Sequence, residues 1–414
     1  MADNNKKLEV LYISNLCSQK LLDYLFQTSI IKPPQETQKF HRLLTQGLAQ
    51  HIDNCTVSAI SSIPVTYSSN KKLVWNHDAE DVEQVHFEYI KFINLPFVRT
   101  ILITINLFIS VLTWCIKNRK KNIVIISDML FLAGSFSALI AAKLTNTKIT
   151  AIVTDIPVLM KPASSYTFSL KSLFFEKAIS VIMTRFSNYI LFTEQMNKIV
   201  NPKSKPYIIM EGLVDNGMRE VSNDIINKDD IRIIMYAGGI FEKYGIKNLV
   251  KGFLKLEYTD IRLDIYGAGD MVEQIVEYSK KDKRVSYKGI LHNRDIVKKE
   301  IEATLLVNPR FSTEKFAQYS FPSKNMEYMV SGTPIVTTKL PGMPQEYYPF
   351  VYLINDESEE GIYETLSFLL KKTNKEHNDF GLKSKEFVLQ KKNNYQQAMR
   401  LILFLNKKTS LKLK

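Results

Sequence analysis

The chain has 414 residues, of which 45% are hydrophobic and 23% charged, and 55 Lys and Arg against 42 Asp and Glu give a net charge of +13. This length predicts two or three domains, and the composition, with few Gly and Pro, excludes a disordered or collagen-like chain. Three scattered cysteines cannot form a disulfide framework, and no Cys/His group has zinc-site spacing, so we expect a reducing, cytoplasmic setting. The positive charge favours an anionic partner: nucleic acid, a phosphorylated substrate or an acidic membrane surface.

Short apolar runs alternate with helical patterns along the first half of the chain. Strands are expected at 8–14, 55–63, 122–128, 148–157, 187–194 and 205–212. Helices are expected at 37–51, over the long segment 87–116, and at 130–145. Such alternation predicts βαβ units and a parallel sheet. His41 and His86 fall in expected helices without a paired nucleophile, and we expect them to be structural or solvated.

The stretch 100–116 carries no charge over its 17 residues, and Arg99 and the run KNRKK at 117–121 flank it. A spanning helix needs about 20 residues, within a range of about 17–25. The length favours a helix buried against a sheet. Two other interpretations stay open: an interfacial helix, with Trp114 at head-group depth and basic residues on anionic lipid, or a full span.

The second half starts afresh after the polar, aperiodic segment 213–230, where we expect the interdomain linker. Further strands are expected at 231–239, 261–270, 284–291, 304–310 and 333–338, and helices at 245–256 and 323–332. Two doubly wound α/β domains facing each other across a cleft are the predicted architecture.

Ligands of open α/β sheets bind at the carboxyl ends of the strands. Gly238 and Gly239 follow one expected strand, Gly289 follows another and Arg310 a third, while Ser323 and Lys324 open a helix. Glycines allow close approach of backbone N–H groups, and helix N-termini favour anions, so this rim predicts a phosphorylated ligand. Neither GxxxxGK[ST] nor GxGxxG after the first strand is present, which argues against a kinase or a dehydrogenase.

Four segments of the second half carry a family resemblance: MYAGGIFEKYGIKNLVKGF (235–253), LDIYGAGD (263–270), YKGIL (287–291) and NPRFSTEKFAQYSFPSKNMEYMVSGTPIVTTKLPGMPQEYY (308–348). They resemble the donor-binding domain of family-4 glycosyltransferases, which have the GT-B fold, and the last segment resembles the bacterial subgroup that builds capsular and exopolysaccharides. The first half fits more loosely, through QKFHRLL, VTDIP and YILFTEQM.

The resemblance implies two Rossmann-like domains and a definite division of the chain. We expect an acceptor-binding domain at 1–215, a linker at 216–230, a nucleotide-sugar domain at 231–390, and at 391–414 a helix that crosses back to the first domain, followed by a basic tail. The tail lysines Lys407, Lys408, Lys412 and Lys414 would give a second contact with anionic lipid.

The resemblance also assigns the diphosphate of the donor to two basic residues. Arg310 and Lys324 would stabilise the negative charge that grows on the leaving phosphate. A cation at a helix start opposes the helix dipole, which favours a ligand role for Lys324 over an ordinary surface position. Glu327, one helical turn after Ser323, takes the second position of the family's Glu-x7-Glu motif and would hold the ribose hydroxyls; the alternative is a solvated helix glutamate.

Other positions match the family less closely. Gly289 and Leu291 would contact the base through the backbone, and Gly342 would begin a loop over the sugar, unless it forms a plain turn. Asp155 stands where the family often has His-Asp, and would bind an acceptor hydroxyl or assist proton transfer, or else form a structural hydrogen bond.

Three departures from the family pattern lie at expected donor contacts. The first glutamate falls on Tyr319, the usual Gly-Arg pair reads Gly238-Gly239, and the usual Lys-Gly reads Tyr244-Gly245. Lys243, one place early, would compensate as a cation.

The sequence therefore predicts a glycosyltransferase that moves a sugar from a UDP- or GDP-sugar to a lipid-linked glycan. We expect it in the cytoplasm, peripherally on the inner face of the plasma membrane, with no cofactor. No Asp-x-Asp pair lies at the rim, so the mechanism is expected to be metal-independent, and retention of configuration follows from the resemblance. The alternative is a non-catalytic nucleotide-binding or assembly subunit; nucleic-acid binding is a weaker possibility because no binding motif is present.

Overall fold

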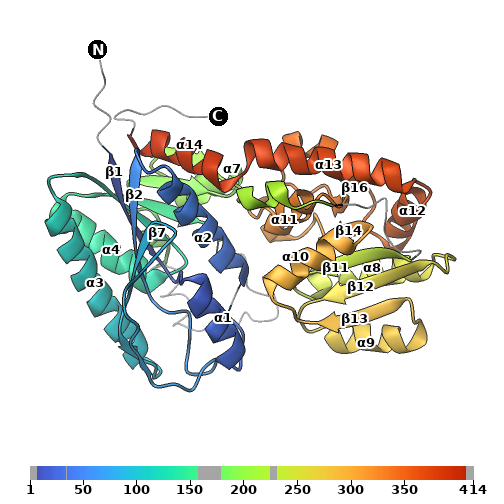
Figure 1. Cartoon of the computed structure of the whole chain (residues 1–414), viewed down its shortest axis with the longest axis horizontal. Coiled ribbons are helices and arrows are strands. Elements are labelled where there is room, and N and C mark those ends of the chain that lie inside the picture. The colour runs from blue at the N-terminus through green and yellow to red at the C-terminus, as the bar shows by residue number, and fades with distance from the viewer. Residues whose placement is uncertain (1–6, 34, 157–178, 224–230, 407–414) are drawn as a thin grey trace, which may run out of the picture. The chain divides into compact units, whose positions relative to one another are not determined.

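The computed structural model describes residues 7–33, 35–156, 179–223 and 231–406 (Figure 1). The chain divides into two compact units: unit 1 comprises 1–213 and 394–414, and unit 2 comprises 214–393. Each unit has its own parallel sheet with helices packed on it. The predicted fold class, two doubly wound α/β units, is confirmed.

The sheet of unit 1 has, among the described residues, eight strands in the order β10-β9-β8-β7-β1-β2-β5-β4. Every pair is parallel except β4–β5. The strands are β1 (Leu8–Ser14), β2 (Cys55–Ser61), β4 (Glu80–Val82), β5 (Val85–Tyr89), β7 (Asn122–Asp128), β8 (Lys148–Val153), β9 (Asn188–Leu191) and β10 (Tyr207–Ile209), and a separate pair is formed by β3 (Val74–Trp75) and β6 (Phe92–Ile93). The central strands are apolar and buried on both faces, as expected for a sheet covered by helices.

The helices of unit 1 are α1 (Gln19–Thr28), α2 (Gln35–Gln50), α3 (Val98–Asn118), α4 (Leu132–Thr145), α7 (Glu194–Val200) and α14 (Asn394–Asn406). The expectation of one helix over 87–116 is wrong in its first part. Val85, Phe87 and Tyr89 are buried in alternation with less buried residues, which is the period of a strand, and Pro96 precedes the helix that follows.

The predicted helix that crosses back to the first domain is α14, which packs on α2 within unit 1. A Cβ on Gly47 would lie 2.3 Å from the Asn394 carbonyl oxygen, so only glycine allows this approach. At the end of α2, His51 Nε2 lies 2.8 Å from the Tyr395 carbonyl oxygen. The basic tail at 407–414 lies outside the described residues.

The sheet of unit 2 has the order β13-β12-β11-β14-β15-β16, with every pair parallel. Its strands are β11 (Arg232–Ala237), β12 (Ile261–Tyr266), β13 (Val285–Gly289), β14 (Leu305–Asn308), β15 (Ile335–Thr338) and β16 (Tyr352–Ile354). Its α-helices are α8 (Ile246–Leu254), α9 (Val272–Lys281), α10 (Asn293–Glu302), α11 (Ser323–Ser331), α12 (Glu359–Leu369) and α13 (Asn374–Lys391), and short 3₁₀ helices lie at η2 (Asn216–Glu220), η4 (Glu242–Tyr244), η5 (Lys315–Gln318) and η6 (Gln345–Phe350).

The first part of the expected linker belongs to unit 2. Residues 216–220 form η2, and the buried Asn223 donates hydrogen bonds from Nδ2 to the Ser331 carbonyl oxygen at 2.9 Å and to Thr333 Oγ1 at 2.7 Å. Residues 224–230 lie outside the described residues. The chain before them is therefore attached to unit 2 by specific contacts.

Candidate functional site

The strand order of unit 2 reverses between two neighbouring strands, β11 and β14. Strands β12 and β13 follow on one side of β11, and β15 and β16 on the other side of β14. Ligands of open parallel sheets bind at the carboxyl ends of the strands at such a reversal. Gly238 and Gly239 directly follow β11 there, and Arg310 is the second residue after the end of β14. The structure thus brings these predicted residues to one edge of the sheet.

The glycine-containing turns after β11, β12 and β13 pack directly on one another. Gly238 N–H donates to the Tyr266 carbonyl oxygen at 3.0 Å, and Gly267 N–H donates to the Gly289 carbonyl oxygen at 2.9 Å. Gly267 has a φ of +133°, and a Cβ there would lie 1.8 Å from the Gly238 carbonyl oxygen. Backbone without side chains therefore lines this edge of the sheet at the glycines, which allows a ligand to approach closely. Leu291, two residues beyond β13, is half-buried.

Two cations share two aromatic rings beside this edge, and we call Lys243, Tyr244, Arg310 and Phe316 the aromatic–cation cluster. Arg310 Cζ lies 4.5 Å from the ring centroid of Tyr244 and 5.7 Å from that of Phe316. Lys243 Nζ lies 5.4 Å and 5.5 Å from the same two centroids. Lys243, expected to compensate for the missing Lys-Gly pair, therefore lies on the same rings as Arg310.

The aromatic–cation cluster contains positive charge without a carboxylate. Within the described ranges, neither Lys243 nor Arg310 has an acidic partner, and the buried Arg310 Nε has no acceptor. Cation–π contacts contribute only about 0.5–2 kcal/mol each, less than a charge-assisted hydrogen bond to phosphate can provide in a desolvated site. The cluster is therefore suited to hold an anion.

Close backbone contact holds the two halves of the cluster together. Gly245 has a φ of +74°, and a Cβ there would lie 2.0 Å from the Pro309 carbonyl oxygen. Any other residue would push the Lys243–Tyr244 turn away from Arg310. The loop after Arg310 is fixed by Glu357, whose two carboxylate oxygens each accept from Ser312 N–H at 3.0 Å.

Helix α11 begins next to Arg310 because a buried asparagine joins three elements. Asn325 is fully buried; its Oδ1 accepts from Asn308 Nδ2 at 2.6 Å, and its Nδ2 donates to Thr337 Oγ1 at 3.2 Å. These bonds tie the first turn of α11 to the ends of β14 and β15. Pro322, the residue before α11, supplies no side-chain cap, and Ser323, the first residue of the helix, is exposed. The positive end of the helix dipole is thus free of a capping side chain, which suits an anion.

Glu327 lies at the centre of a second group, the α11 cluster, with Lys324 and Asn293. Its Oε2 accepts from Lys324 Nζ at 2.8 Å, and its Oε1 accepts from Asn293 Nδ2 at 2.7 Å. The side chains of Lys324 and Glu327 are only 15% and 10% exposed. The alternative of a solvated helix glutamate is therefore excluded. Lys324 and Glu327, expected to contact different parts of the donor, form an ion pair with each other.

The helix that carries the α11 cluster is locked to β11 by Tyr328. Its hydroxyl accepts from Ala237 N–H at 2.8 Å and donates to the Ala237 carbonyl oxygen at 3.2 Å. Burial raises the pKa of Tyr328 well above its usual value of 10.0, so the phenol stays protonated as a donor. Tyr319, at the position of the missing first glutamate, is the half-buried C-cap of η5.

Gly342 has a packing role of its own. Its N–H donates to the Ala317 carbonyl oxygen at 3.2 Å, and a Cβ would lie 2.6 Å from the Ser320 carbonyl oxygen. The loop that it begins is therefore packed against η5, the segment that carries Phe316 of the aromatic–cation cluster.

Asp155 belongs to unit 1, where it follows β8 and is half-exposed and in contact with other groups.

In the described part of the chain, no group of three or more His, Cys, Asp or Glu side chains is placed to hold a metal ion. The three cysteines are buried and unpaired, and burial raises the pKa of Cys55 to about 12.

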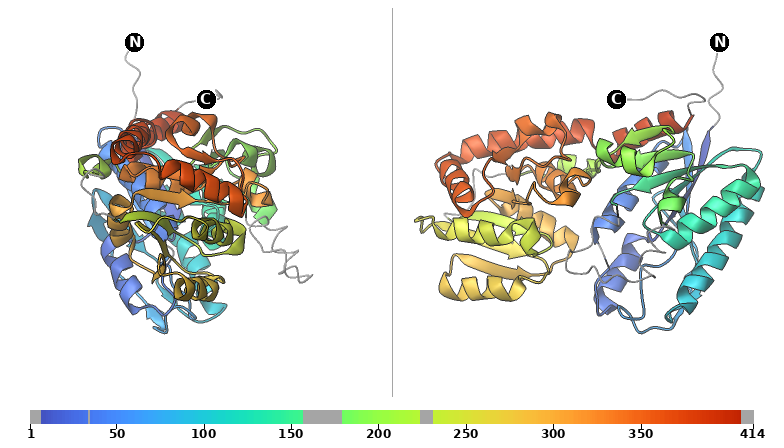
Figure 2. Two further views of the ribbon diagram at one scale, coloured as in Figure 1. Left: turned by 90° about the vertical axis from the view of Figure 1, so that its right-hand side faces the viewer. Right: turned by 180° about the vertical axis from the view of Figure 1, so that it is seen from behind.

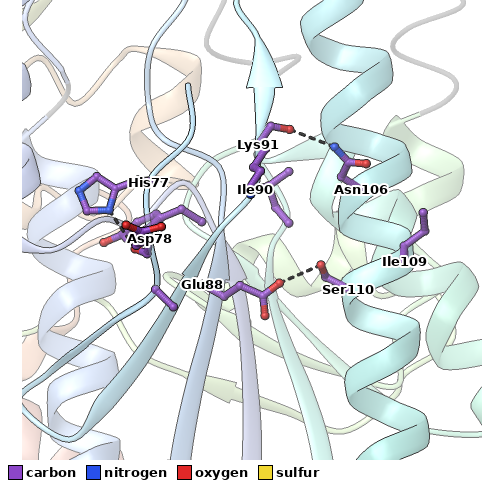
Figure 3. A pocket seen from close by; sticks show the side chains of 10 residues that line it. His77, Asp78, Glu88, Ile90, Lys91, Asn106, Ile109 and Ser110 are labelled. Atoms are coloured by element: carbon purple, nitrogen blue, oxygen red, sulfur yellow. Dashed lines mark hydrogen bonds between the residues drawn. The ribbon is translucent and has the colours of Figure 1, made fainter. Parts of the chain in front are cut away.

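Unit 1 also has a pocket that the sequence did not predict (Figure 3). Its volume is about 450 Å³, and its polar lining includes His77, Asp78, Glu88, Asn106 and Ser110. Glu88 Oε1 accepts from Ser110 Oγ at 2.9 Å, and Asn106 Nδ2 donates to the Lys91 carbonyl oxygen at 3.0 Å, which joins β5 to α3. None of the predicted site residues lines it.

Comparison with known families identifies a domain within unit 2. Residues 218–387 match the family described as "Glycosyl transferases group 1". No curated protein sequence matches the chain. Both clusters lie within the matched residues.

Solved structures share the fold over nearly the whole chain. Sucrose-phosphate synthase from Thermosynechococcus elongatus is 14% identical with a TM-score of 0.65, and the match covers 96% of this chain and 97% of that one. A glycosyltransferase from Rickettsia africae is 14% identical with a TM-score of 0.63 over 98% and 100% of the two chains. HepE from Anabaena, in complex with UDP, is 12% identical with a TM-score of 0.60 over 96% and 99%.

These likenesses identify the fold as GT-B, as predicted. The family match over residues 218–387 confirms the predicted class of enzyme, a glycosyltransferase. Its nucleotide-sugar donor stays a prediction. The family-4 assignment and the polysaccharide subgroup stay predictions.

Proposed function

We propose that the protein is a family-4 glycosyltransferase of bacterial capsular or exopolysaccharide biosynthesis, which transfers a sugar from a UDP- or GDP-sugar to a lipid-linked glycan. The observation that carries the proposal is the aromatic–cation cluster beside the strand-order reversal of unit 2, where Arg310 and Lys243 lie together with no carboxylate partner among the residues that the structure describes. HepE, a structural neighbour, has been solved with UDP-glucose, which makes UDP-sugars the first donors to test.

The diphosphate of the donor would contact Arg310, Lys243 and the N-terminus of α11 at Ser323. Negative charge grows on the leaving phosphate as the bond to the anomeric carbon breaks. Fixed donors aimed at that charge lower the barrier because they need no reorganisation during the reaction. Lys324, held 2.8 Å from Glu327, would add positive charge while keeping the carboxylate in place.

The ribose would bind Glu327, because a carboxylate held by Lys324 and Asn293 is oriented in advance to accept hydroxyl hydrogen bonds. The base would lie against the backbone of Gly289 and Leu291, and the pyrophosphate beside Gly238, near the N–H group of Gly239. Gly342 would begin a loop beside the sugar.

The acceptor side of the proposal assigns Asp155 of unit 1 to an acceptor hydroxyl or to proton transfer. We propose a retaining reaction that uses neither a cofactor nor a metal ion, in accord with the resemblance described above. The proposed location is the cytoplasm, peripherally on the inner face of the plasma membrane.

The test is a thermal-shift screen of the purified protein over UDP- and GDP-sugars, followed by incubation of the labelled donor with bacterial lipid extract. A specific donor raises the melting temperature by mass action, and radiolabel appears in the lipid fraction. Transfer should survive EDTA. Tight binding of a sugar nucleotide without transfer of any sugar would favour the non-catalytic assembly subunit, and binding of no nucleotide would overturn both.

A further inference from the structure

An apolar surface extends along two neighbouring helices of unit 1, α3 and α4, which lie side by side (Figures 1 and 2). Its large side chains are between 38% and 66% exposed. We call it the α3–α4 face; it consists of Ile101, Ile105, Ile109 and Ile116 of α3 and Phe136, Ile140 and Leu144 of α4. Exposed apolar patches of this kind on soluble proteins commonly mark interaction sites.

Helix α3 has the length and apolar composition of a membrane-crossing helix, but its other face is part of the core. Ile103, Leu107 and Val111 are at most 1% exposed. Polar contacts also bind the helix to its neighbours: Ser110 Oγ donates to Glu88 at 2.9 Å, and Ser137 Oγ of α4 donates to the Thr104 carbonyl oxygen at 2.8 Å. A full span would break these contacts, so α3 lies along unit 1 with one face outward.

The charges that α3, α4 and the turn after α3 carry themselves have one sign. Neither 98–118 nor 132–145 contains an Asp or Glu. Lys117, Arg119 and Lys120 are exposed at the end of α3, and Lys143 is exposed on α4.

Acidic neighbours come from other elements: Glu88 accepts from Ser110, and Asp78 lines the same pocket as Ile109. An apolar helix face with basic residues at its border is complementary to an anionic lipid surface, where the apolar side chains enter the head-group boundary and the cations contact lipid phosphates.

We infer that the α3–α4 face binds an anionic phospholipid bilayer, with the axis of α3 in the plane of the membrane. This deepens the proposed peripheral location by naming its surface, and it rests on the proposed function only for the use that the enzyme would make of the membrane. A second copy of the chain is the competing occupant, but the exposed cations of α3, α4 and the turn after α3 would meet themselves across a symmetric dimer interface.

The test is flotation of the full-length protein with vesicles of phosphatidylglycerol and phosphatidylcholine, and with vesicles of phosphatidylcholine alone. We expect binding to the anionic vesicles that weakens as salt is added. The double variant Ile101→Glu/Ile105→Glu should lower the vesicle partition coefficient by about tenfold or more, because two apolar anchors become anionic. The matched control is Ile52→Glu in unit 1, since Ile52 is 55% exposed but outside the face; it should bind as wild type.

Two measurements separate this inference from its alternatives. The melting temperature and the donor-induced thermal shift of the double variant should equal those of the wild type, so a failure of membrane binding is distinguishable from a failure of the donor site. Equal binding of the double variant and the wild type would overturn the inference. A wild-type dimer that becomes monomeric in the double variant, with no vesicle binding by either, would assign the face to a second copy instead.

Discussion

The strand order reverses in both units, but the side chains gathered beside the reversal differ in charge balance. In unit 1 the reversal lies between β1 and β7. There Tyr12 Oη lies 2.6 Å from His41 Nδ1, and His41 Nε2 lies 3.3 Å from Asp128 Oδ2. The three side chains are almost fully buried; Tyr12 and His41 share a hydrogen bond, whereas His41 Nε2 contacts the Asp128 carboxylate without a hydrogen bond. In unit 2, Lys243 and Arg310 lie on aromatic rings with no carboxylate partner in the described part of the chain.

The comparison shows that the same strand-order reversal can carry a carboxylate beside a histidine ring, as in unit 1, or cations without an acidic partner in the described residues, as in unit 2. In unit 1 the buried carboxylate of Asp128 lies beside the His41 ring, so no positive charge on that ring is left without an acidic neighbour. In unit 2 positive charge without an acidic partner attracts an anion, and it lies beside the carboxyl ends of strands, where open parallel sheets bind ligands. The predictions that follow test this difference, from the largest expected effect to the smallest.

Removal of the Arg310 guanidinium should have the largest effect. We expect Arg310→Ala to lower kcat by about 10²–10³-fold and donor affinity much less, because its partner charge grows in the transition state. Steady-state kinetics over donor concentration measures both, and Arg310→Lys should recover part of kcat. The control is Lys247→Ala, whose ammonium is paired with Glu242 at 3.0 Å. A loss confined to affinity would mean that Arg310 makes only a ground-state contact.

Disruption of the unit 1 network should affect stability and leave the donor site intact. His41→Phe leaves a buried tyrosine hydroxyl without its hydrogen-bond partner and a buried carboxylate without its polar neighbour, and should lower the free energy of unfolding by about 1–3 kcal/mol. Urea denaturation measures the loss, and the thermal shift with the donor should persist. A variant as stable as the wild type would contradict the view that this network holds unit 1 together.

Loss of the Glu327 carboxylate should weaken donor binding by about 1–3 kcal/mol, the cost of leaving polar partners unpaired. Isothermal titration of the nucleotide with Glu327→Ala measures it. A matched control is Glu364→Ala, an exposed glutamate of α12. Because Lys324 loses its ion-pair partner in the Glu327 variant, a 2′-deoxynucleotide donor provides the sharper comparison. The wild type should bind the deoxy donor less tightly than the ordinary donor, whereas the variant should bind the two donors with equal affinity. Unchanged affinity in the variant would remove Glu327 from the site.

Acid should destabilise unit 2 slightly, through His377 of α13. Its Nε2 lies 3.1 Å from the Leu369 carbonyl oxygen, its Nδ1 has no partner in the described part of the chain, and burial lowers its pKa from the usual 6.5. The unfolded chain therefore binds more protons near and below pH 6.5, so stability falls as the pH falls through that range. His377→Gln should flatten the dependence of the melting temperature on pH; an unchanged slope would assign the effect to other groups.

The sequence predicted unit 2 well because the residues assigned to the proposed donor site stand next to strand ends and helix starts. Arg310, Ser323 and Gly238 could be located from local patterns alone. The pairing of Lys324 with Glu327, the bond from Asn293 and the stacking of Arg310 on Tyr244 could not, because each depends on side-chain directions between elements distant in sequence. Tyr244 was read only as a departure from the Lys-Gly pattern, whereas its ring is part of the cluster. Asn308 and Asn325 stand at the end of an expected strand and the start of an expected helix, but neither belongs to a motif that would have predicted the hydrogen bond between them.

Unit 1 was predicted less completely. Strand β5 was read as part of a helix because it has only five residues and a long helical pattern follows it. His41 was expected to be structural, which agrees with its burial, but neither Tyr12 nor Asp128 has a sequence signal that joins it to that histidine. The uncharged stretch at 100–116 left three interpretations open, because composition cannot tell which face of a helix the fold covers.

The position of α14 in unit 1 has a consequence for synthesis. Unit 2 is inserted into unit 1, and its two ends meet where Val214 N–H donates to the Lys392 carbonyl oxygen at 3.0 Å. A ribosome must therefore translate the whole inserted unit before residues 394–406 emerge and cover α2. Unit 1 therefore lacks one of its helices during synthesis until the C-terminal part of the chain has been translated.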